Sequence, residues 1–492
     1  MPLADPVSKH SPTARKLLRF TLLCGFILTG IFTIDHYLFA EKNFTRLFGE
    51  RTAEGQIFDK VKRGLAFAKH GDALFFGSSY IRYGITAPPF RDRNLIAYNF
   101  GLTGGGPVTA YYALKSIAPV LAVRQEKPIL VLELVSATMR KAQKGGTFAE
   151  FPPFTALVRE RLDMIVELPL LYRLFESYGI GSRFLSGVAV PSSLYRRYGR
   201  QIHKFGHLRG YFWGMESAAG FVGLYEYTGM AKPKKSRLAR PFAISQLQQE
   251  KLEFAKKFIR LANRIGCPVA IISSPLFDTL SENWDAFDYV AKHLKEEFPN
   301  LEFVRQSSYQ LTVADFTDDG AAHLNIIGAD KFTDAIIREL GLSGDAVGYR
   351  RKYLSLFEQL DIPTFSDGAA KPGVSRSFEG DGVVSVDYVP QVPYWIDSVE
   401  TEQLSVRTGE EYFVELHVDA PIGRVQYCFR EFDGENPDTF RQICGVTSTA
   451  IKASRYHLRF RPNLPQVTMV LQTREATRAR IRINRFMRAK FE

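Results

Sequence analysis

Between residues 53 and 345, short apolar runs alternate with stretches of helical periodicity. Runs such as ALFF and PVAIIS are nearly continuous in apolar residues, which is typical of strands that a parallel sheet buries on both faces. Strands of this kind are expected at 73–76, 95–100, 127–134, 268–273 and 301–304. Because strand and helix alternate along the chain, the pattern predicts an α/β domain with a parallel sheet and helices on both faces over residues 53–345.

Beyond this region the period of the apolar pattern changes. From Val383 onward apolar residues recur at every second position, as at Val414, Leu416 and Val418. Strands with this alternation at short spacing predict an all-β sandwich over residues 383–492. Residues 346–382 are predicted as a helix followed by a linker, because the second part of this segment contains Pro, Gly and Ser without periodicity.

One stretch, about residues 140–240, interrupts the α/β rhythm and is rich in aromatic and basic residues. We expect it to form a cap inserted beside the active site. Within it His203 and His207 stand four residues apart and could hold a metal on a helix, but no carboxylate or third ligand is near them in sequence. Since Lys and Arg flank both histidines, a solvated basic surface is expected here, and no metal site.

The N-terminal residues predict where the body of the protein works. Residues 20–40 are mostly apolar and long enough to cross a bilayer as a helix, and Arg15, Lys16 and Arg19 precede them. By the positive-inside rule, residues 1–19 are expected in the cytoplasm, 20–40 as a single anchor in the inner membrane, and the remainder in the periplasm or outside the cell. A cleaved signal peptide is the alternative, but no convincing small-x-small site follows the apolar run.

Composition narrows the class of protein. Apolar residues make up 45% and charged residues 24%, which fits a globular body and excludes wholesale disorder or a multi-span membrane protein. The 64 Lys and Arg exceed the 52 Asp and Glu, giving a net charge of +12. This balance favours anionic partners such as lipid headgroups or acidic polymers. No nucleic-acid recognition motif accompanies the charge, so no nucleic-acid partner is expected.

Three segments of the α/β region carry candidate chemistry. Ser79 follows a buried strand on a tight turn before a helix, which places a hydroxyl at the carboxyl edge of the sheet. Gly104 and Gly105 lie in a glycine-rich turn after the second strand, where backbone N–H groups can stabilise an oxyanion. His323 precedes the last helix of the domain and can reach the serine, and Asp319, one turn earlier, can orient the imidazole.

The same segments resemble a known superfamily. The runs FFGSSYIRYGI, YNFGLTGGGP and DFTDDGAAHLNIIGADKFT resemble, in order, the nucleophile, oxyanion-glycine and histidine blocks of SGNH (GDSL-like) hydrolases, which have a flavodoxin-like parallel sheet. Within that superfamily, the Gly-Ser-Ser form, the N-terminal anchor and the His-Leu-Asn ending are most similar to membrane-bound cell-envelope members, such as the D-alanine transfer protein of lipoteichoic acid and the accessory acetyltransferases of alginate. The resemblance covers roughly residues 70–345 without the insertion. It implies that Ser79 is the nucleophile and an oxyanion donor, Gly104 the oxyanion glycine and His323 the base.

Two positions depart from the pattern of that superfamily. Gly320 stands where the family has an aspartate three residues before the histidine, which leaves Asp319, Asp318 or a simple Ser-His dyad as alternatives. The oxyanion asparagine expected after the third strand is not evident at 134–136. Asn99, which precedes the glycine turn, is expected to be a structural turn residue.

Other motifs admit more than one interpretation. The glycines at 104–106 could cradle a phosphate, but they lack the Gly-Lys-Ser/Thr ending and the GxGxxG spacing, so no nucleotide cofactor is expected. Tyr394 and Trp395 could stack on sugar rings, although a core role is the favoured interpretation. Cys428 and Cys444 lie in strand-like stretches and could form a disulfide in an oxidising compartment.

These features together predict an enzyme. We expect serine-dependent acyl transfer or ester hydrolysis, of the O-acetyl type, on a cell-envelope or exported polysaccharide, through an acyl-Ser79 intermediate. Transferase and hydrolase share this intermediate and differ only in the acceptor. The expected partners are the glycan, the membrane and a membrane-bound acyl-donor protein. The alternative is a non-catalytic polysaccharide-binding or assembly protein with a degenerate SGNH fold.

Overall fold

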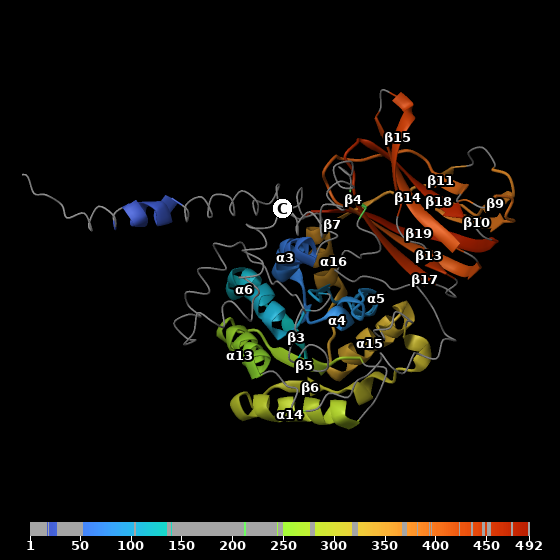
Figure 1. Ribbon diagram of the computed structural model, residues 1–492. Coiled ribbons are helices and arrows are strands. Elements are labelled where there is room, and N and C mark those ends of the chain that lie inside the picture. The colour runs from blue at the N-terminus through green and yellow to red at the C-terminus, as the bar shows by residue number, and fades with distance from the viewer. Residues whose placement is uncertain are drawn as a thin grey trace, which may run out of the picture. The chain divides into compact units, whose positions relative to one another are not determined.

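The computed structural model describes residues 17, 19–26, 53–102, 105–134, 139, 211–212, 244, 249–275, 281–316, 323–366, 371–380, 382–392, 394, 396–422, 424–433, 436–444, 448–449, 454–473 and 476–490 (Figure 1). The chain divides into two compact units, of which residues 1–55 and 149–204 form one and residues 56–148 and 205–492 the other. In the first unit a helix covers residues 19–26. The second unit contains the α/β domain and the β domain described below.

The predicted anchor at residues 20–40 is described only in part. Residues 20–26 are helical, and Phe20, Leu22, Leu23 and Phe26 are exposed. Among the helices that the structure describes, none is both long and apolar enough to span a membrane. Residues 27–40 lie outside the described part of the chain, so the anchor stays a prediction.

The α/β domain is built on a five-stranded parallel sheet. Its strand order is β2-β1-β3-β5-β6. The strands are β1 (Ala73–Phe76), β2 (Ala97–Asn99), β3 (Ile129–Leu134), β5 (Val269–Ser273) and β6 (Glu302–Val304). All five fall within the runs predicted as strands, and each of β1, β3 and β5 is almost wholly buried, as expected for a sheet covered on both faces. The predicted parallel α/β fold is therefore confirmed.

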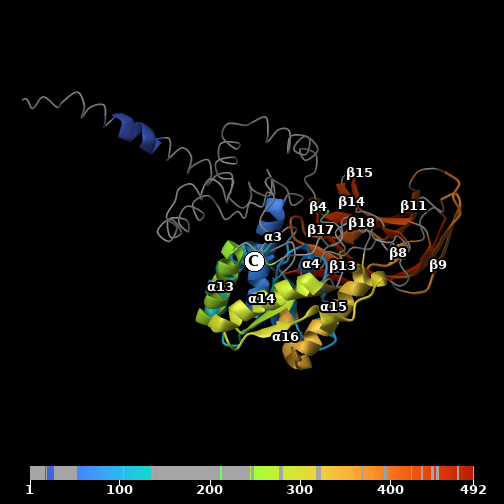
Figure 2. The same ribbon diagram turned by 60° about the horizontal axis from the view of Figure 1, so that its bottom comes forward.

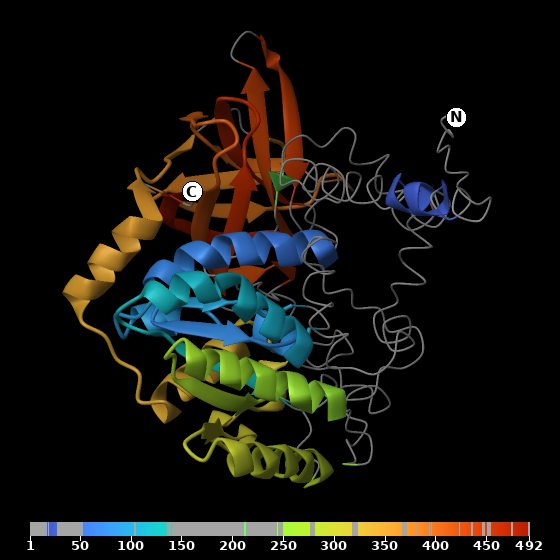
Figure 3. The same cartoon turned by 90° about the vertical axis from the view of Figure 1, so that its left-hand side faces the viewer.

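Helices cover both faces of this sheet. One face carries α3 (Ala53–His70), α6 (Pro107–Val123), α13 (Gln249–Arg264) and α14 (Ser281–Glu297). The other face carries α4 (Ser79–Arg82), α5 (Pro88–Arg91) and α15 (Ile326–Glu339). Alternate residues of β1 divide between the two cores: Leu74 packs with the first group of helices and Phe75 with the second. Figures 1 and 2 show α13 and α15 on opposite sides of the sheet, and Figure 3 looks onto the face covered by α3, α6, α13 and α14.

After α15 the chain continues through α16 (Ala346–Leu356) into two antiparallel sheets. The first contains β4 (Tyr211–Phe212), β17 (Ser454–Arg461), β13 (Tyr412–Ile422), β19 (Thr477–Ala489), β10 (Val383–Tyr388), β9 (Val374–Phe378) and β7 (Phe357–Leu360). The second contains β15 (Asn436–Cys444), β14 (Arg424–Asp433), β18 (Gln466–Thr473), β11 (Ile396–Thr401), β8 (Phe365–Ser366), β12 (Leu404–Ser405) and β16 (Ser448–Thr449). Aromatic side chains join the two sheets, as where Phe429 stacks on Phe460 with ring centroids 4.0 Å apart. The predicted β-sandwich is confirmed.

Two local predictions need correction. The predicted linker contains β8 and β9, which form the edges of the two sheets; β9 is mostly exposed and polar, so it carries no apolar alternation. Most of the predicted cap at 140–240 lies outside the described residues, and β4, which pairs with β17, is the one element described within it, so the cap stays a prediction. Tyr394 is 62% exposed and therefore has no core role, while Trp395 lies outside the described residues.

The cysteines agree with the expected pattern. Cys428 is disulfide-bonded, and its neighbour in register on β15 is Cys444. Cys24 and Cys267 are free. Burial raises the pKa of the Cys267 thiol to about 11, so it is an unreactive core residue.

Candidate active site

Ser79 lies at the carboxyl edge of the parallel sheet. β1 ends at Phe76, the turn Gly77-Ser78 follows, and Ser79 is the first residue of the short helix α4. Ser78 caps this helix, because its hydroxyl oxygen accepts the Tyr80 N–H at 3.1 Å. The turn thus exposes the Ser79 side chain at the edge of the sheet, as its position after a buried strand predicts.

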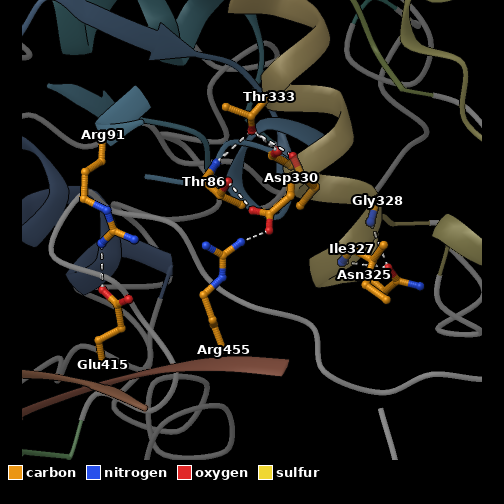
Figure 4. A network of polar contacts seen from close by, with 11 residues as sticks. Thr86, Arg91, Asn325, Ile327, Gly328, Asp330, Thr333, Glu415 and Arg455 are labelled. Carbon is orange, nitrogen blue, oxygen red and sulfur yellow. Dashed lines mark hydrogen bonds and ion pairs between the residues drawn. The ribbon is translucent and has the colours of Figure 1, made fainter. Parts of the chain in front are cut away.

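His323 meets Ser79 across a large distance in sequence. The imidazole Nε2 lies 2.8 Å from the Ser79 Oγ, and the histidine side chain is largely buried. Asn325, two residues later, caps α15: its Oδ1 accepts the N–H groups of Ile327 and Gly328 at 3.0 and 2.9 Å (Figure 4). The Asn325 Nδ2 also donates to the Ala314 carbonyl at 2.7 Å, which fixes the strand-like segment that presents His323.

Two tyrosines that were not foreseen from the sequence hold the imidazole ring. Tyr83 contacts His323 edge-to-face with ring centroids 4.7 Å apart. The Tyr80 ring is tilted relative to the imidazole, with centroids 5.3 Å apart. Both follow Ser79 within or next to α4. The helix that carries the candidate nucleophile therefore also limits the orientation of the candidate base. Tyr80 and Tyr83 lie one and four residues after the serine, a spacing that could have indicated this role.

The other predicted site residues have mixed outcomes. Asp318, Asp319 and Gly104 lie outside the described residues, so the acid and the first oxyanion glycine stay predictions. Gly105 is described, and its N–H donates to the Leu102 carbonyl at 2.9 Å. Because this hydrogen bond closes the glycine turn, Gly105 is not a free oxyanion donor in this arrangement. The Ser79 N–H, at the start of a helix, has no acceptor among the described residues, as expected for the first turn of a helix.

A buried carboxyl, also not foreseen, lies behind the Ser79 turn. Glu133 is the second-last residue of β3 and is completely buried. Its Oε2 accepts the Ser78 N–H at 2.6 Å, and its Oε1 lies 3.1 Å from the Ser78 hydroxyl and contacts the Ser274 hydroxyl. Burial raises the pKa of Glu133, and the hydrogen bonds from the two serines and the proximity of His323 oppose this shift only in part. A charged residue type inside the apolar run ILVLEL was the signal in the sequence.

Asn99 ties the glycine turn to α4. Its Nδ2 donates to the Ile81 and Ile85 carbonyls at 2.7 and 3.1 Å, and its Oδ1 accepts the Gly101 N–H at 2.8 Å. The side chain is buried, and these contacts satisfy its polar atoms. Asn99 is therefore the structural turn residue that the sequence predicts, and it joins the segments that carry Ser79 and the glycines.

A second polar network connects α15 with the residues that follow α4 and with the β domain (Figure 4). The Thr86 N–H donates to the Thr333 hydroxyl at 3.0 Å, and the Thr86 hydroxyl donates to Asp330 Oδ1 at 2.7 Å. The other Asp330 oxygen pairs with Arg455 on β17. Beside this pair, Arg91 of α5 donates to Glu415 of β13 at 3.2 Å. The β domain thus contacts the helices that hold the candidate site.

In the described ranges, no group of three or more His, Cys, Asp or Glu side chains is arranged to hold a metal ion. His203 and His207 lie outside those ranges. The described site contains the Ser79 hydroxyl, the His323 imidazole and the buried Glu133 carboxyl.

The chain is similar to solved structures only at low sequence identity and low TM-score. No protein family model matches the sequence, and no curated protein matches it either. A Streptococcus pneumonia protein named for platelet activating factor matches with 11% identity and a TM-score of 0.28, over 58% of this chain and 95% of its own. A family 29 carbohydrate binding module matches with 17% identity and a TM-score of 0.19, over 27% of this chain and 88% of its own. A family 4 module matches with 12% identity and a TM-score of 0.19, over 24% and 79%. Because these TM-scores are below 0.5, no property of those proteins is assigned to this chain.

Proposed function

We propose that the protein is a serine-dependent acyltransferase or esterase that works through an acyl-Ser79 intermediate. The observation that carries this proposal is the 2.8 Å separation between the Ser79 Oγ and the His323 Nε2 at the carboxyl edge of the sheet. A hydroxyl is a weak nucleophile at neutral pH, and an adjacent imidazole is a common way to activate it.

The first half-reaction forms the covalent intermediate. His323 Nε2 accepts the Ser79 proton as Oγ bonds to the acyl carbonyl carbon, and the π electrons of the carbonyl move onto its oxygen. We propose that the Ser79 N–H, which has no acceptor among the described residues, stabilises this oxyanion, with Gly104 as a further candidate donor. When the carbonyl re-forms, its bond to the leaving alkoxy group breaks, and the imidazolium returns the proton to that oxygen.

The second half-reaction transfers the acyl group. A water or a sugar hydroxyl gives its proton to His323 as it attacks the acyl-Ser79 carbonyl, and the proton then returns to the Ser79 oxygen as the ester bond breaks. Water as acceptor gives hydrolysis and a hydroxyl gives transfer. We propose a cell-envelope or exported polysaccharide as the substrate, which gains an O-acetyl group in transfer or loses one in hydrolysis. The resemblance of the three sequence blocks to cell-envelope members of the SGNH superfamily supports this proposal.

A serine-directed fluorophosphonate probe tests the proposal. We expect it to label the wild type and the control variant Ser355→Ala, which removes an exposed hydroxyl on α16, to the same extent. We expect no labelling of Ser79→Ala, and slow labelling of His323→Ala because the hydroxyl then lacks its base. Equal labelling of Ser79→Ala and the wild type would refute the proposal and favour a non-catalytic, glycan-binding protein.

We further propose that the chain is anchored in the inner membrane and that its body is exported. The apolar residues 20–40 and the basic residues before them support this arrangement. A fusion of residues 1–52 to alkaline phosphatase, which is active only after export, measures it directly. High phosphatase activity in the membrane fraction is expected, and an inactive fusion would contradict the proposal.

A further inference from the structure

The buried Glu133 carboxyl is hydrogen-bonded to the Ser79 turn. A polar group in the interior is costly unless hydrogen bonds satisfy it. In Glu133 both carboxyl oxygens are engaged, and the partners come from segments that follow the two neighbouring strands: Ser78 after β1 and Ser274 after β5. We propose that Glu133 is a positioning residue, which fixes the turn that carries Ser79 by hydrogen bonds rather than by charge. This inference rests on the proposed function of Ser79.

The contacts lead from Glu133 to the nucleophile in two steps. Glu133 Oε2 holds the Ser78 N–H at 2.6 Å, and the Ser78 hydroxyl, itself 3.1 Å from Oε1, accepts the Tyr80 N–H at 3.1 Å. Ser79 stands between Ser78 and Tyr80, so its backbone is fixed on both sides. A misplacement of a reacting group by about 1 Å can cost about 100-fold in rate, so this small set of hydrogen bonds can matter for catalysis.

The turn is also packed tightly against the carboxyl. A Cβ at Gly77 would overlap Glu133 Oε2, so the backbone approaches the carboxyl as closely as only glycine allows. On the other side of the turn, the Gly77 carbonyl accepts the Leu102 N–H at 3.1 Å, and a Cβ at Gly105 would lie 2.8 Å from the same carbonyl oxygen. Glu133 therefore supports the serine turn and, through it, the glycine turn.

The surroundings favour the neutral carboxyl. Burial raises the pKa of Glu133, and the titratable groups near it are His323 and Tyr309, the latter itself buried beside Ser273. Glu133 Oε2 accepts the Ser78 N–H, and Oε1 accepts the Ser78 and Ser274 hydroxyls. A glutamine has nearly the same shape: its oxygen can accept the Ser78 N–H, and its amide Nε2 can donate to the two hydroxyls, because a serine hydroxyl can also accept. Positioning by hydrogen bonds thus predicts that Glu133→Gln retains the function, whereas Glu133→Ala loses it.

The experiment compares four variants in hydrolysis of an aryl acetate. We expect Glu133→Ala to lower kcat about 100-fold with KM within about threefold of the wild type, as for a misplaced nucleophile. Glu133→Gln should stay within about fivefold of the wild-type kcat, since it keeps the hydrogen bonds. The control is Leu132→Ala, on the same strand, whose side chain packs in the core on the other face of the sheet. This substitution leaves a cavity there and should lower thermal stability while leaving kcat nearly unchanged. Ser79→Ala gives the rate of ester hydrolysis without the nucleophile.

The outcomes separate the two proposals. If Glu133→Gln lowers kcat as far as Glu133→Ala does, the charge matters and the inference is wrong. A wild-type kcat in Glu133→Ala also overturns the inference. If wild type and Ser79→Ala are equally inactive, the proposed function fails, and hydrogen exchange of residues 77–83 still decides the role of Glu133. Faster exchange there in Glu133→Ala, with wild-type exchange in Glu133→Gln, supports positioning, and unchanged exchange in Glu133→Ala overturns it.

Discussion

The ion pair between Asp330 and Arg455 gives the sharpest prediction about how the β domain supports the site. Asp330 stands on α15, the helix that begins three residues after His323, and it also accepts the Thr86 hydroxyl. Arg455 reaches it from β17 (Figure 4). In Arg455→Met the carboxylate would lose its cation and keep its partly buried position. We therefore expect a loss of stability.

The size of the loss follows from exposure. Side chains of the pair are 26% and 28% exposed, between a fully buried pair and a surface pair. Breaking a buried pair costs about 3 to 5 kcal/mol, and an exposed pair is worth about 0.2 to 1 kcal/mol. We expect about 1 to 3 kcal/mol for Arg455→Met, and a smaller loss when Asp330→Asn is combined with it, because no unpaired charge then remains.

The loss should also depend on pH. Burial raises the pKa of Asp330 and Arg455 lowers it, so removing the arginine raises the pKa further. At acid pH the carboxyl is protonated in both proteins and their stabilities should converge. As the pH rises the carboxyl must ionise without its cation in the variant, and the difference should grow.

Urea unfolding followed by circular dichroism, at pH 4.5 and pH 7, measures these effects. The matched control is Arg478→Met, whose pair with Asp387 in the same β domain is 72% and 46% exposed, and which should cost well below 1 kcal/mol. The ion pair does not support the fold as proposed if Arg455→Met is no less stable than Arg478→Met, or if adding Asp330→Asn lowers the stability of Arg455→Met further.

Three further predictions concern other parts of the chain. The stability of Glu133→Gln relative to the wild type should rise as the pH rises above the ordinary carboxyl range, by at most about 1.4 kcal/mol per pH unit, because the raised pKa of Glu133 makes its ionisation costly in the folded state. A pH-independent difference in urea midpoints would contradict this. Cys428→Ala should lower the free energy of unfolding by about 2 to 4 kcal/mol because it removes the disulfide. A reductant should lower the stability of the wild type but not of the variant. Asn325→Ala removes the cap of α15 and should lower the free energy of unfolding by about 0.5 to 2 kcal/mol. It should also lower kcat, since His323 stands two residues away. An unchanged kcat would mean that the cap does not position the imidazole.

The sequence predicts the framework of the α/β domain well, because its strands are buried on both faces and therefore continuous in apolar residues. Strands β8 and β9 were missed for the opposite reason. They lie at sheet edges, and the polar, mostly exposed β9 has no apolar periodicity to distinguish it from a linker. Edge strands contribute little to the core, so their sequences are weakly constrained.

The candidate site divides in a similar way. The approach of Ser79 to His323 follows from the order of the sequence blocks and the topology of a parallel sheet, which brings strand ends to one edge. The role of Glu133 does not follow from the sequence, because an apolar pattern indicates only that the residue belongs to a strand. It does not show that one side chain of β3 reaches the loops after both neighbouring strands. The use of the Gly105 amide inside its own turn likewise depends on backbone geometry that glycine content does not specify.

In the proposed mechanism an acyl group passes through the Ser79 oxygen. Rapid quenching of the enzyme after mixing with an aryl acetate, followed by peptide mass spectrometry, detects such an intermediate. We expect an acetyl group on Ser79 in the wild type within the first turnover and none in Ser79→Ala. Turnover of the ester by the wild type with no acetyl group on this serine, or with the acetyl group on another residue, would contradict it.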